Sequence, residues 1–363
     1  MKRRWGIALL IGMMLTAACA QAAQPYPREQ VHAIVEQLFV AAAGTTHEAE
    51  LAAREGLTAE EDAARSAMHI AHREKTLPWL KAAFTPEGKN GLTMKMPSLI
   101  PEATPSEPTE PAWTLEDGYA ALMDNAHAAP YLSAIAELGG TDAESCMAVT
   151  QAVCRQWMAE VDHDALSEIN GHYACWIYGP GVNIDYPIVQ GSDNEYYLYR
   201  MFNRKQNASG ALFIDFRNLP GFMDPNTLVY GHHMRNEGMF GLLDEYGKQA
   251  FFDAHPFMLI LSPEEIDVLQ IFAGYTTSKH DHCYDIAISD EEDLRLFIET
   301  ALQKTDFVSG VEVGVSDHLV TLSTCAYAFE GARYIAIGRL EPIWTQPKAW
   351  MLEMEQSAEG PGA

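Results

Sequence analysis

The spacing of apolar residues predicts helices over most of residues 26–162. One stripe recurs every three or four positions, as on one face of an amphipathic helix, and consists of Val31, Ile34, Val35, Leu38 and Phe39. Thr58 and Glu61 have the spacing of a capping box, which predicts a second helix running to about Lys75. Further helices are predicted over residues 115–123 and 142–161.

The pattern later changes to the alternation that is typical of strands. In the run Leu319–Cys325, Val320 and Leu322 fall on one face, while Thr321, Ser323 and Cys325 fall on the other. The run therefore delivers a thiol to the end of a strand. Most lone cysteines are buried and inert, so a catalytic role for Cys325 requires partners elsewhere in the chain.

Two other strand-like runs offer such partners. Residues 226–233 end on His232 and His233, and imidazole is the usual base for a thiol nucleophile. Arg333 opens the apolar run 333–338, where a guanidinium is costly unless an anion or a carbonyl accepts its hydrogen bonds.

These motifs carry a resemblance to a known family, because the chain from about Asp164 to Trp344 resembles the class B sortases. Thr321–Cys325 matches the family's Thr-Leu-x-Thr-Cys strand, Gly231-His232 matches its Gly-His at a strand end, and Arg333 matches its strand arginine. The resemblance implies a mainly β fold, a closed eight-stranded sortase-type barrel with added helices, preceded here by a mostly helical N-terminal region.

Two further segments fit the same resemblance. Residues 176–178 and 184–190 resemble the family's opening hairpin. A predicted helix over Asp290–Lys304, between the strand around residues 269–272 and the cysteine strand, is typical of class B.

The resemblance also implies a mechanism. Cys325 is the expected nucleophile, His232 the acid and base, and Arg333 the group that binds the substrate carbonyl or the oxyanion. Tyr230, Ser323 and Thr324 are the expected substrate-binding residues. Neighbours on a strand face opposite ways, so we expect His233 to be structural. This chemistry implies no cofactor, and we assign no calcium site.

The implied reaction is cleavage of a C-terminal sorting signal of secreted proteins, followed by transfer of the thioacyl intermediate to an amine. That amine belongs to a peptidoglycan cross-bridge or to a lysine of a pilin subunit. Two alternatives stay open at this point: an extracellular cysteine hydrolase that passes the thioacyl group to water, and a non-catalytic wall-binding or scaffold protein.

Composition narrows the choice of partners. The net charge of −26 and the pI near 4.7 argue against nucleic acid or an anionic membrane surface as a partner of the body of the protein. Basic peptides and cationic wall polymers remain compatible with this charge.

The first residues have the layout of an export signal. Basic residues 1–4 precede an uncharged run over residues 5–23. The run ends in small residues that suit a signal peptidase, whereas the resemblance favours a retained anchor. We therefore expect an enzyme on the extracellular face of the cell membrane of a Gram-positive-type envelope.

The expected organisation follows from these patterns. It comprises a signal or anchor segment (1–23), a helical region (24–96), a Pro-rich linker (97–113), helices leading into the barrel (114–162), the catalytic domain (163–345) and a C-terminal tail (346–363). For the helical region we expect a stalk with packing helices, with regulation or partner binding as the alternative.

Six cysteines complete the inventory: Cys19, Cys146, Cys154, Cys175, Cys283 and Cys325. Cys146 and Cys154 are eight positions apart, which is about 12 Å in a continuous helix and too far for a disulfide. We expect Cys175 and Cys283 to fill apolar space, with a disulfide between them as the alternative. The loop 279–283 carries His and Cys, and we expect a solvated loop there, with a metal site as the alternative.

Overall fold

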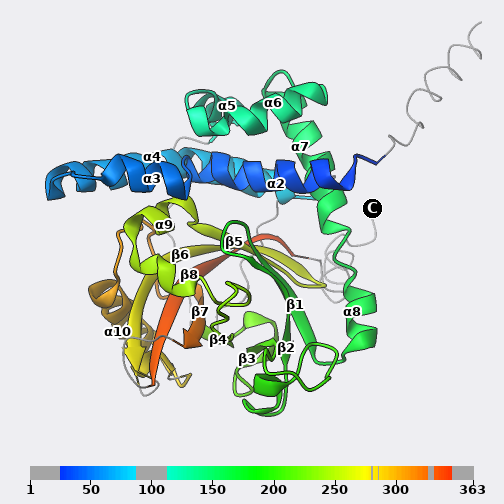
Figure 1. The fold of residues 1–363 in the computed structure, drawn as a ribbon, viewed down its shortest axis with the longest axis vertical. Coiled ribbons are helices and arrows are strands. Elements are labelled where there is room, and N and C mark those ends of the chain that lie inside the picture. The colour runs from blue at the N-terminus through cyan, green and yellow to red at the C-terminus, as the bar shows by residue number, and fades with distance from the viewer. Residues whose placement is uncertain (1–24, 87–112, 279–280, 285, 326–330, 346–363) are drawn as a thin grey trace, which may run out of the picture.

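The computed structural model describes residues 25–86, 113–278, 281–284, 286–325 and 331–345. Within these residues the chain forms a closed eight-stranded barrel, in the order β1-β2-β3-β4-β7-β8-β6-β5 (Figure 1). The strands are β1 (Tyr173–Gly179), β2 (Ile184–Gln190), β3 (Leu212–Ile214), β4 (Asn226–Tyr230), β5 (Phe257–Leu261), β6 (Glu265–Ser278), β7 (His318–Cys325) and β8 (Ala332–Thr345). The predicted fold class is confirmed.

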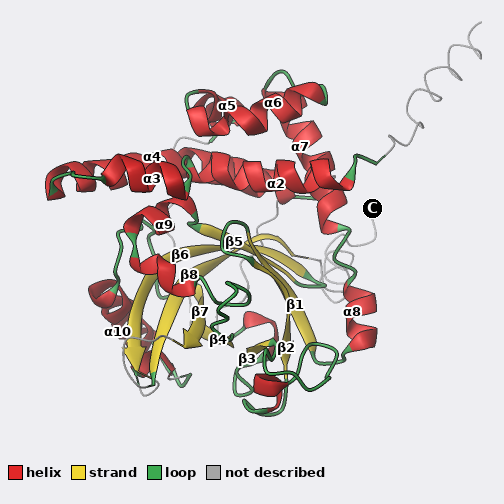
Figure 2. Cartoon of the chain, viewed as in Figure 1, coloured by secondary structure: helices red, strands yellow, loops and turns green. Residues whose placement is uncertain are grey.

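Helices precede the barrel in the chain and also connect some of its strands (Figure 2). The α-helices are α2 (Arg28–Ala43), α3 (His47–Arg54), α4 (Ala59–Phe84), α5 (Leu115–Met123), α6 (Ala129–Glu137), α7 (Ala143–Met158), α8 (His163–Ile169), α9 (Gln249–Ala254) and α10 (Glu291–Lys304). Short 3₁₀ turns are η1 (Ala126–Ala128), η2 (Tyr196–Tyr199), η3 (Pro220–Phe222), η4 (Leu243–Gly247) and η5 (His282–Tyr284).

Strand pairing sets the architecture around the predicted site. β1 and β2 form the expected antiparallel hairpin, and α10 confirms the helix predicted between β6 and β7. β4 and β7 run parallel, while β7 and β8 run antiparallel. The C-terminal ends of β4 and β7 therefore meet the first residues of β8 at one end of the barrel.

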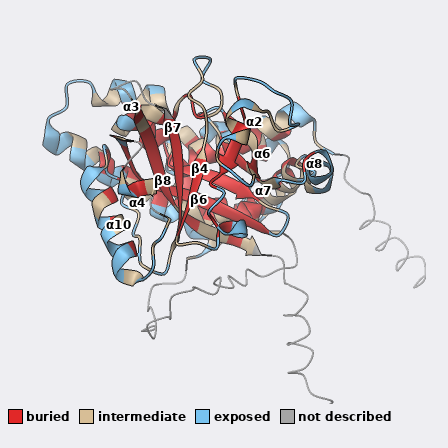
Figure 3. Cartoon of the chain, turned by 90° about the horizontal axis from the view of Figure 1, so that it is seen from below, coloured by how far each residue is buried: buried red, intermediate tan, exposed pale blue. Residues whose placement is uncertain are grey.

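The helical layer and the barrel share one apolar core. α2, α4 and α7 contribute apolar side chains that pack with those of β1, β5 and β6, and buried positions run continuously across the junction (Figure 3). The ring of Tyr178 on β1 lies 4.6 Å from that of Trp157 on α7 and 5.8 Å from that of Phe39 on α2, measured between centroids. The packing helices of the expected N-terminal region thus lie directly on the barrel.

The helix that begins at the capping box is longer than predicted. Thr58 and Glu61 cap α4 as expected, but α4 continues to Phe84, past Lys75 and through Pro78. A proline inside a helix costs about 3 kcal/mol, and burial of Trp79, Leu80 and Phe84 beyond it offsets that cost. Two helices of this layer, α3 and α6, were not predicted from the sequence.

Buried ion pairs join the same two layers. Asp253 on α9 is fully buried and accepts hydrogen bonds from Arg54 of α3 and, at 2.9 Å, from Nη1 of Arg73 of α4. Glu50 on α3 is also fully buried and binds Arg65 through both of its oxygens. Burial alone would raise the pKa of Glu50, but the bonds from His69 and Arg65 outweigh it and hold that pKa well below its usual range.

The structure describes the side chains of four of the six cysteines. Cys146, Cys154, Cys175 and Cys283 are buried free thiols, and α7 is continuous through the first two, as predicted. Burial raises the pKa of Cys146 to about 11, so this thiol is protonated at neutral pH.

We expected a solvated loop over residues 279–283, and this prediction is wrong for Cys283, the last of these residues. Cys283 is 2% exposed because it packs in the apolar cluster beneath α10, and Asp281 pairs with Lys304 of that helix at 2.7 Å. Lys279 and His280 lie outside the described residues.

Several predicted segments also lie outside the described residues, namely the signal or anchor segment (1–23), linker residues 97–112 and the tail (346–363). Among the helices that are described, none combines the length and the apolar character that crossing a membrane requires.

Candidate active site

Strand register brings the three predicted catalytic residues to one end of the barrel. Tyr230 of β4 lies beside Ser323 of β7, and the N–H of Gly231 donates to the Ser323 carbonyl at 3.0 Å. His232 follows at the next position, level with the end of β7. Cys325 is the last residue of β7 and is paired directly with Arg333 of β8.

Directly paired residues of antiparallel strands have Cα atoms about 4.5–5.5 Å apart, within reach of each other's side chains. The backbone thus brings Cys325 and Arg333 together, with His232 on the neighbouring strand. The side chain of Cys325 lies outside the described part of the chain.

The two histidines have different partners. The Nε2 atom of His232 is 2.7 Å from the carbonyl oxygen of Leu198, and the ring is half-buried. The Nε2 atom of His233 is 3.2 Å from a carboxylate oxygen of Asp244 in η4. His233 therefore contacts the loop beyond β4, which agrees with the structural role predicted for it.

The sortase B of Staphylococcus aureus is 32% identical over 179 residues, which are 49% of this chain and 73% of that protein. The sortase B of Listeria monocytogenes is 32% identical over 177 residues, which are 48% of this chain and 72% of that protein. The chain belongs to the class B sortase family. It is accordingly a cysteine transpeptidase of the sortase type.

A solved complex of Staphylococcus aureus sortase B with its substrate is 29% identical, with a TM-score of 0.49, and the match covers 52% of this chain and 92% of that chain. No family model matches the chain.

The three residues predicted to bind substrate differ in burial and in the face of the strand that they occupy. Tyr230 is half-buried and donates its hydroxyl hydrogen to Asp215 at 2.9 Å. Ser323 is 2% exposed and its Oγ lies 2.7 Å from the hydroxyl of Tyr284. Thr324 is also buried, and strand alternation puts its side chain on the opposite face of β7 from Ser323, the face that lines the barrel core.

Tyr284 is a neighbour of the sortase site that was not predicted from the sequence. Its ring stacks on that of Tyr230 with centroids 6.3 Å apart and an interplanar angle of 10°. Burial raises the pKa of Tyr284 well above its ordinary value, although the Ser323 hydroxyl and the charge of Arg333 oppose the shift. Tyr284 comes directly after the His- and Cys-containing loop over residues 279–283, for which the sequence predicted a solvated loop, with a metal site as the alternative.

The hydroxyl of Tyr230 is held by the buried carboxylate of Asp215. Asp215 follows β3, is fully buried, and accepts hydrogen bonds from Arg217, Asn194 and Tyr230. Burial alone would raise its pKa, but the bonds from Arg217 and the others lower that pKa below its usual range. Asp215 therefore remains ionised at neutral pH and fixes the hydroxyl of Tyr230.

Among the described residues, the guanidinium of Arg333 makes one hydrogen bond. Nη1 of its guanidinium donates to the carbonyl of Ala332 at 3.0 Å, and the side chain is half-buried. A guanidinium carries five N–H donors, so it can also bind a substrate carbonyl or an oxyanion.

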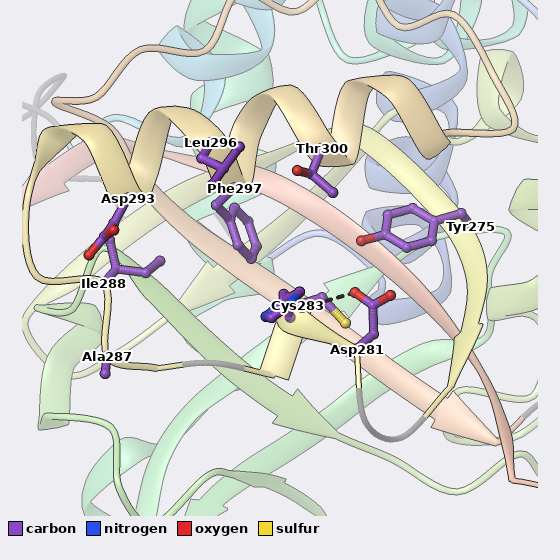
Figure 4. Close-up of a pocket in the computed structure, with 10 residues that line it drawn as sticks. Tyr275, Asp281, Cys283, Ala287, Ile288, Asp293, Leu296, Phe297 and Thr300 are labelled. Carbon is purple, nitrogen blue, oxygen red and sulfur yellow. Dashed lines mark hydrogen bonds between the residues drawn. The ribbon is translucent and has the colours of Figure 1, made fainter.

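A cavity of about 280 Å³ lies between α10 and η5 (Figure 4). Its walls are mainly apolar and include Ile288, Phe297 and the buried Cys283. Asp281 at its edge already pairs with Lys304, and Asp293 accepts hydrogen bonds from Ser289. The cavity is thus a feature of the packing of α10, and its lining includes none of the predicted catalytic residues.

One group among the described residues has the spacing of metal ligands, namely Glu50, His69 and Asp253. The guanidinium groups of Arg54 and Arg65 bind oxygens of these carboxylates, and Arg73 binds Asp253 as well. The arrangement is therefore explained as an ion-pair network that holds helices to the barrel.

Proposed function

We propose that this sortase cleaves a sorting signal near the C-terminus of secreted proteins and transfers the resulting acyl group to an amine of peptidoglycan. A lysine of a pilin subunit is the alternative acceptor. The observation that carries the proposal is the register of β4, β7 and β8, in which His232, Cys325 and Arg333 converge at one end of a sortase barrel.

The proposed chemistry divides among these three residues. A free thiol has a pKa of about 8.5 and is mostly protonated at pH 7, so nearby positive charge favours the reactive thiolate. Cys325 attacks the scissile carbonyl, and the guanidinium of Arg333 binds the oxygen that becomes negative. His232 gives a proton to the leaving amine and later takes one from the incoming amine.

Tyr230 and Ser323 are the proposed contacts for the sorting signal, together with Tyr284. Support comes from their contacts with one another, which join the turn before α10 to β4 and β7. In this arrangement the side chain of Thr324 contributes to the barrel core, because it is 1% exposed on the inner face of β7.

The proposed location is the extracellular face of the cell membrane, with residues 1–23 as the N-terminal anchor. The net charge of −26 is compatible with basic peptides and with amine-bearing wall polymers as partners.

Product analysis tests the proposal. The full chain is incubated with labelled peptides from a sorting-signal library, together with an oligoglycine, a diamino acid peptide or no amine. We expect a product that contains the added amine, and no product from Cys325→Ala. Cys154→Ala, which changes a thiol buried in the helical layer, is the matched control and should retain activity. Release of hydrolysed peptide alone, whichever amine is present, would instead support the hydrolase.

A further inference from the structure

The carbonyl group that contacts His232 belongs to a firmly held turn. Leu198 lies in η2, and the carbonyls on either side of it are already used: that of Tyr197 accepts from the Ala211 N–H at 3.0 Å and that of Tyr199 from the Asn207 N–H at 2.9 Å. The Leu198 carbonyl instead contacts Nε2 of His232 at 2.7 Å.

The side chain of Tyr197 fixes the same turn to the barrel. It is fully buried, and its hydroxyl oxygen accepts a hydrogen bond from the amide of Asn170 at 2.9 Å. The hydroxyl also lies 3.0 Å from Nδ1 of His172, just before β1. The position of the Leu198 carbonyl is therefore set by contacts that do not involve His232.

Gly210 lies next to both the Leu198 carbonyl and the ring of His232. Its φ is +60°, and a Cβ atom there would lie 2.6 Å from the Tyr197 oxygen, 2.7 Å from the Leu198 oxygen and 3.0 Å from Cδ2 of His232. Real Cβ atoms almost never approach a backbone oxygen this closely, so a side chain at position 210 would displace the two carbonyls of η2, the imidazole or both. Glycine is thus required both for its backbone conformation and for this approach.

A carbonyl oxygen can only accept a hydrogen bond, so the ring nitrogen that faces it must carry the hydrogen. We infer that Leu198 and Gly210 are positioning residues that keep the proton of neutral His232 on Nε2, which leaves Nδ1 as the nitrogen that exchanges protons in catalysis. The inference about catalysis rests on the proposed function, whereas the inference about the tautomer does not.

Proton balance is simple in this arrangement. Nδ1 accepts the thiol proton of Cys325, which gives a thiolate and an imidazolium. After the thiolate attacks, the same nitrogen gives the proton to the leaving amine. It then takes a proton from the acceptor amine as this amine attacks the thioester and the Cys325 thiolate leaves, which restores the pair of thiolate and imidazolium. Nε2 keeps its hydrogen throughout, and the hydrogen bond to Leu198 persists through the cycle.

Nitrogen NMR of the full chain tests the tautomer directly. Two-bond ¹H–¹⁵N correlations report which ring nitrogen carries the hydrogen, and comparison with His232→Gln identifies the signal among the 13 histidines. The expected result is a neutral ring protonated on Nε2. A neutral ring protonated on Nδ1 overturns the inference, whether or not the protein transfers peptides.

Gly210→Ala tests the contact, with Gly221→Ala as the matched control. Gly221 has a similar φ of +74°, but a Cβ atom at this position would have no atom within 4 Å, so it shares the backbone strain without the close approach. We expect Gly210→Ala to lose the Nε2–H signature and to lower kcat by roughly 10- to 100-fold with little change in KM. Gly221→Ala should keep both.

Equal effects of the two glycine variants would overturn the role of the contact. If Gly210→Ala fails to fold, the spectrum of the unaltered protein decides the inference by itself. A protein with His232 protonated on Nε2 but without transfer activity would contradict the proposed function and leave the tautomer assignment intact.

Discussion

Asp253→Asn tests whether buried charge holds the helical layer on the barrel. The Asp253 carboxylate is fully buried and is shared by two guanidiniums, those of Arg54 and Arg73, which are themselves largely buried. Asparagine has nearly the same shape but no charge. The substitution therefore leaves Arg73 of α4 without its counter-ion, whereas Arg54 of α3 keeps its ion pairs with Glu50 and Asp62.

The structure sets the size of the effect. Removing one partner of a buried ion pair typically costs about 3–5 kcal/mol, because the remaining charge stays desolvated. Arg73 keeps two other contacts, the Ser309 carbonyl at 3.2 Å from Nη2 and the ring of Phe252 at 5.1 Å from its guanidinium carbon. We therefore expect the loss in the free energy of unfolding to be near the lower end, about 3 kcal/mol.

Urea unfolding measures this loss, read as a lower midpoint with an unchanged slope. Glu245→Gln, which breaks the exposed pair with Lys248, is the control and should cost at most about 1 kcal/mol. Combining Asp253→Asn with Arg73→Met should cost less than the sum of the two single changes, because the second change removes an unpaired charge. A loss below about 1 kcal/mol for Asp253→Asn, or strict additivity in the double variant, would refute the reasoning.

Three further predictions concern pH and the site. Burial, with His47 nearby, lowers the pKa of His255 from 6.5 to about 4. Between these two pH values His255 is protonated in the unfolded chain but stays neutral in the folded chain. The free energy of unfolding should therefore fall by roughly 3 kcal/mol as the pH drops from about 6.5 to about 4. Urea titrations at several pH values should show this fall reduced in His255→Gln. Arg333→Lys keeps the charge but loses the planar fork, and we expect kcat/KM for peptide transfer to fall roughly 100-fold, whereas an unchanged value would exclude the oxyanion role. Tyr284→Phe takes away the hydroxyl that the buried Ser323 hydroxyl contacts and should cost about 1 kcal/mol of stability, with a higher KM for the sorting peptide; an unchanged KM would remove Tyr284 from the substrate groove.

The strand-end positions of His232, Cys325 and Arg333 could be predicted because strand patterns and short motifs are local. The alternation before Cys325 specified a strand, and the resemblance implied a closed eight-stranded barrel. Even so, the direct pairing of Cys325 with Arg333 is a matter of register, which the structure supplies. The same alternation indicates that Thr324 points into the barrel, although it was expected among the substrate-binding residues.

Other features depend on contacts between distant segments and could not be predicted. Asp253 and Arg73 are 180 positions apart, and neither lies in a motif that indicates a partner. α4 runs past Pro78 because the last turns bury large side chains against other helices, so tertiary packing overrides the local cost of proline. The contact between Leu198 and His232 joins two loops and involves a backbone oxygen, which no residue type reveals.

The proposed chemistry depends most directly on Cys325 as the residue that carries the acyl group. Intact mass and peptide fragmentation of the full chain, quenched during turnover of a sorting peptide, locate that group. We predict an acyl adduct on Cys325 that an added amine discharges, with no adduct in Cys325→Ala. An adduct on one of the other thiols, or turnover that persists in Cys325→Ala, would contradict this mechanism.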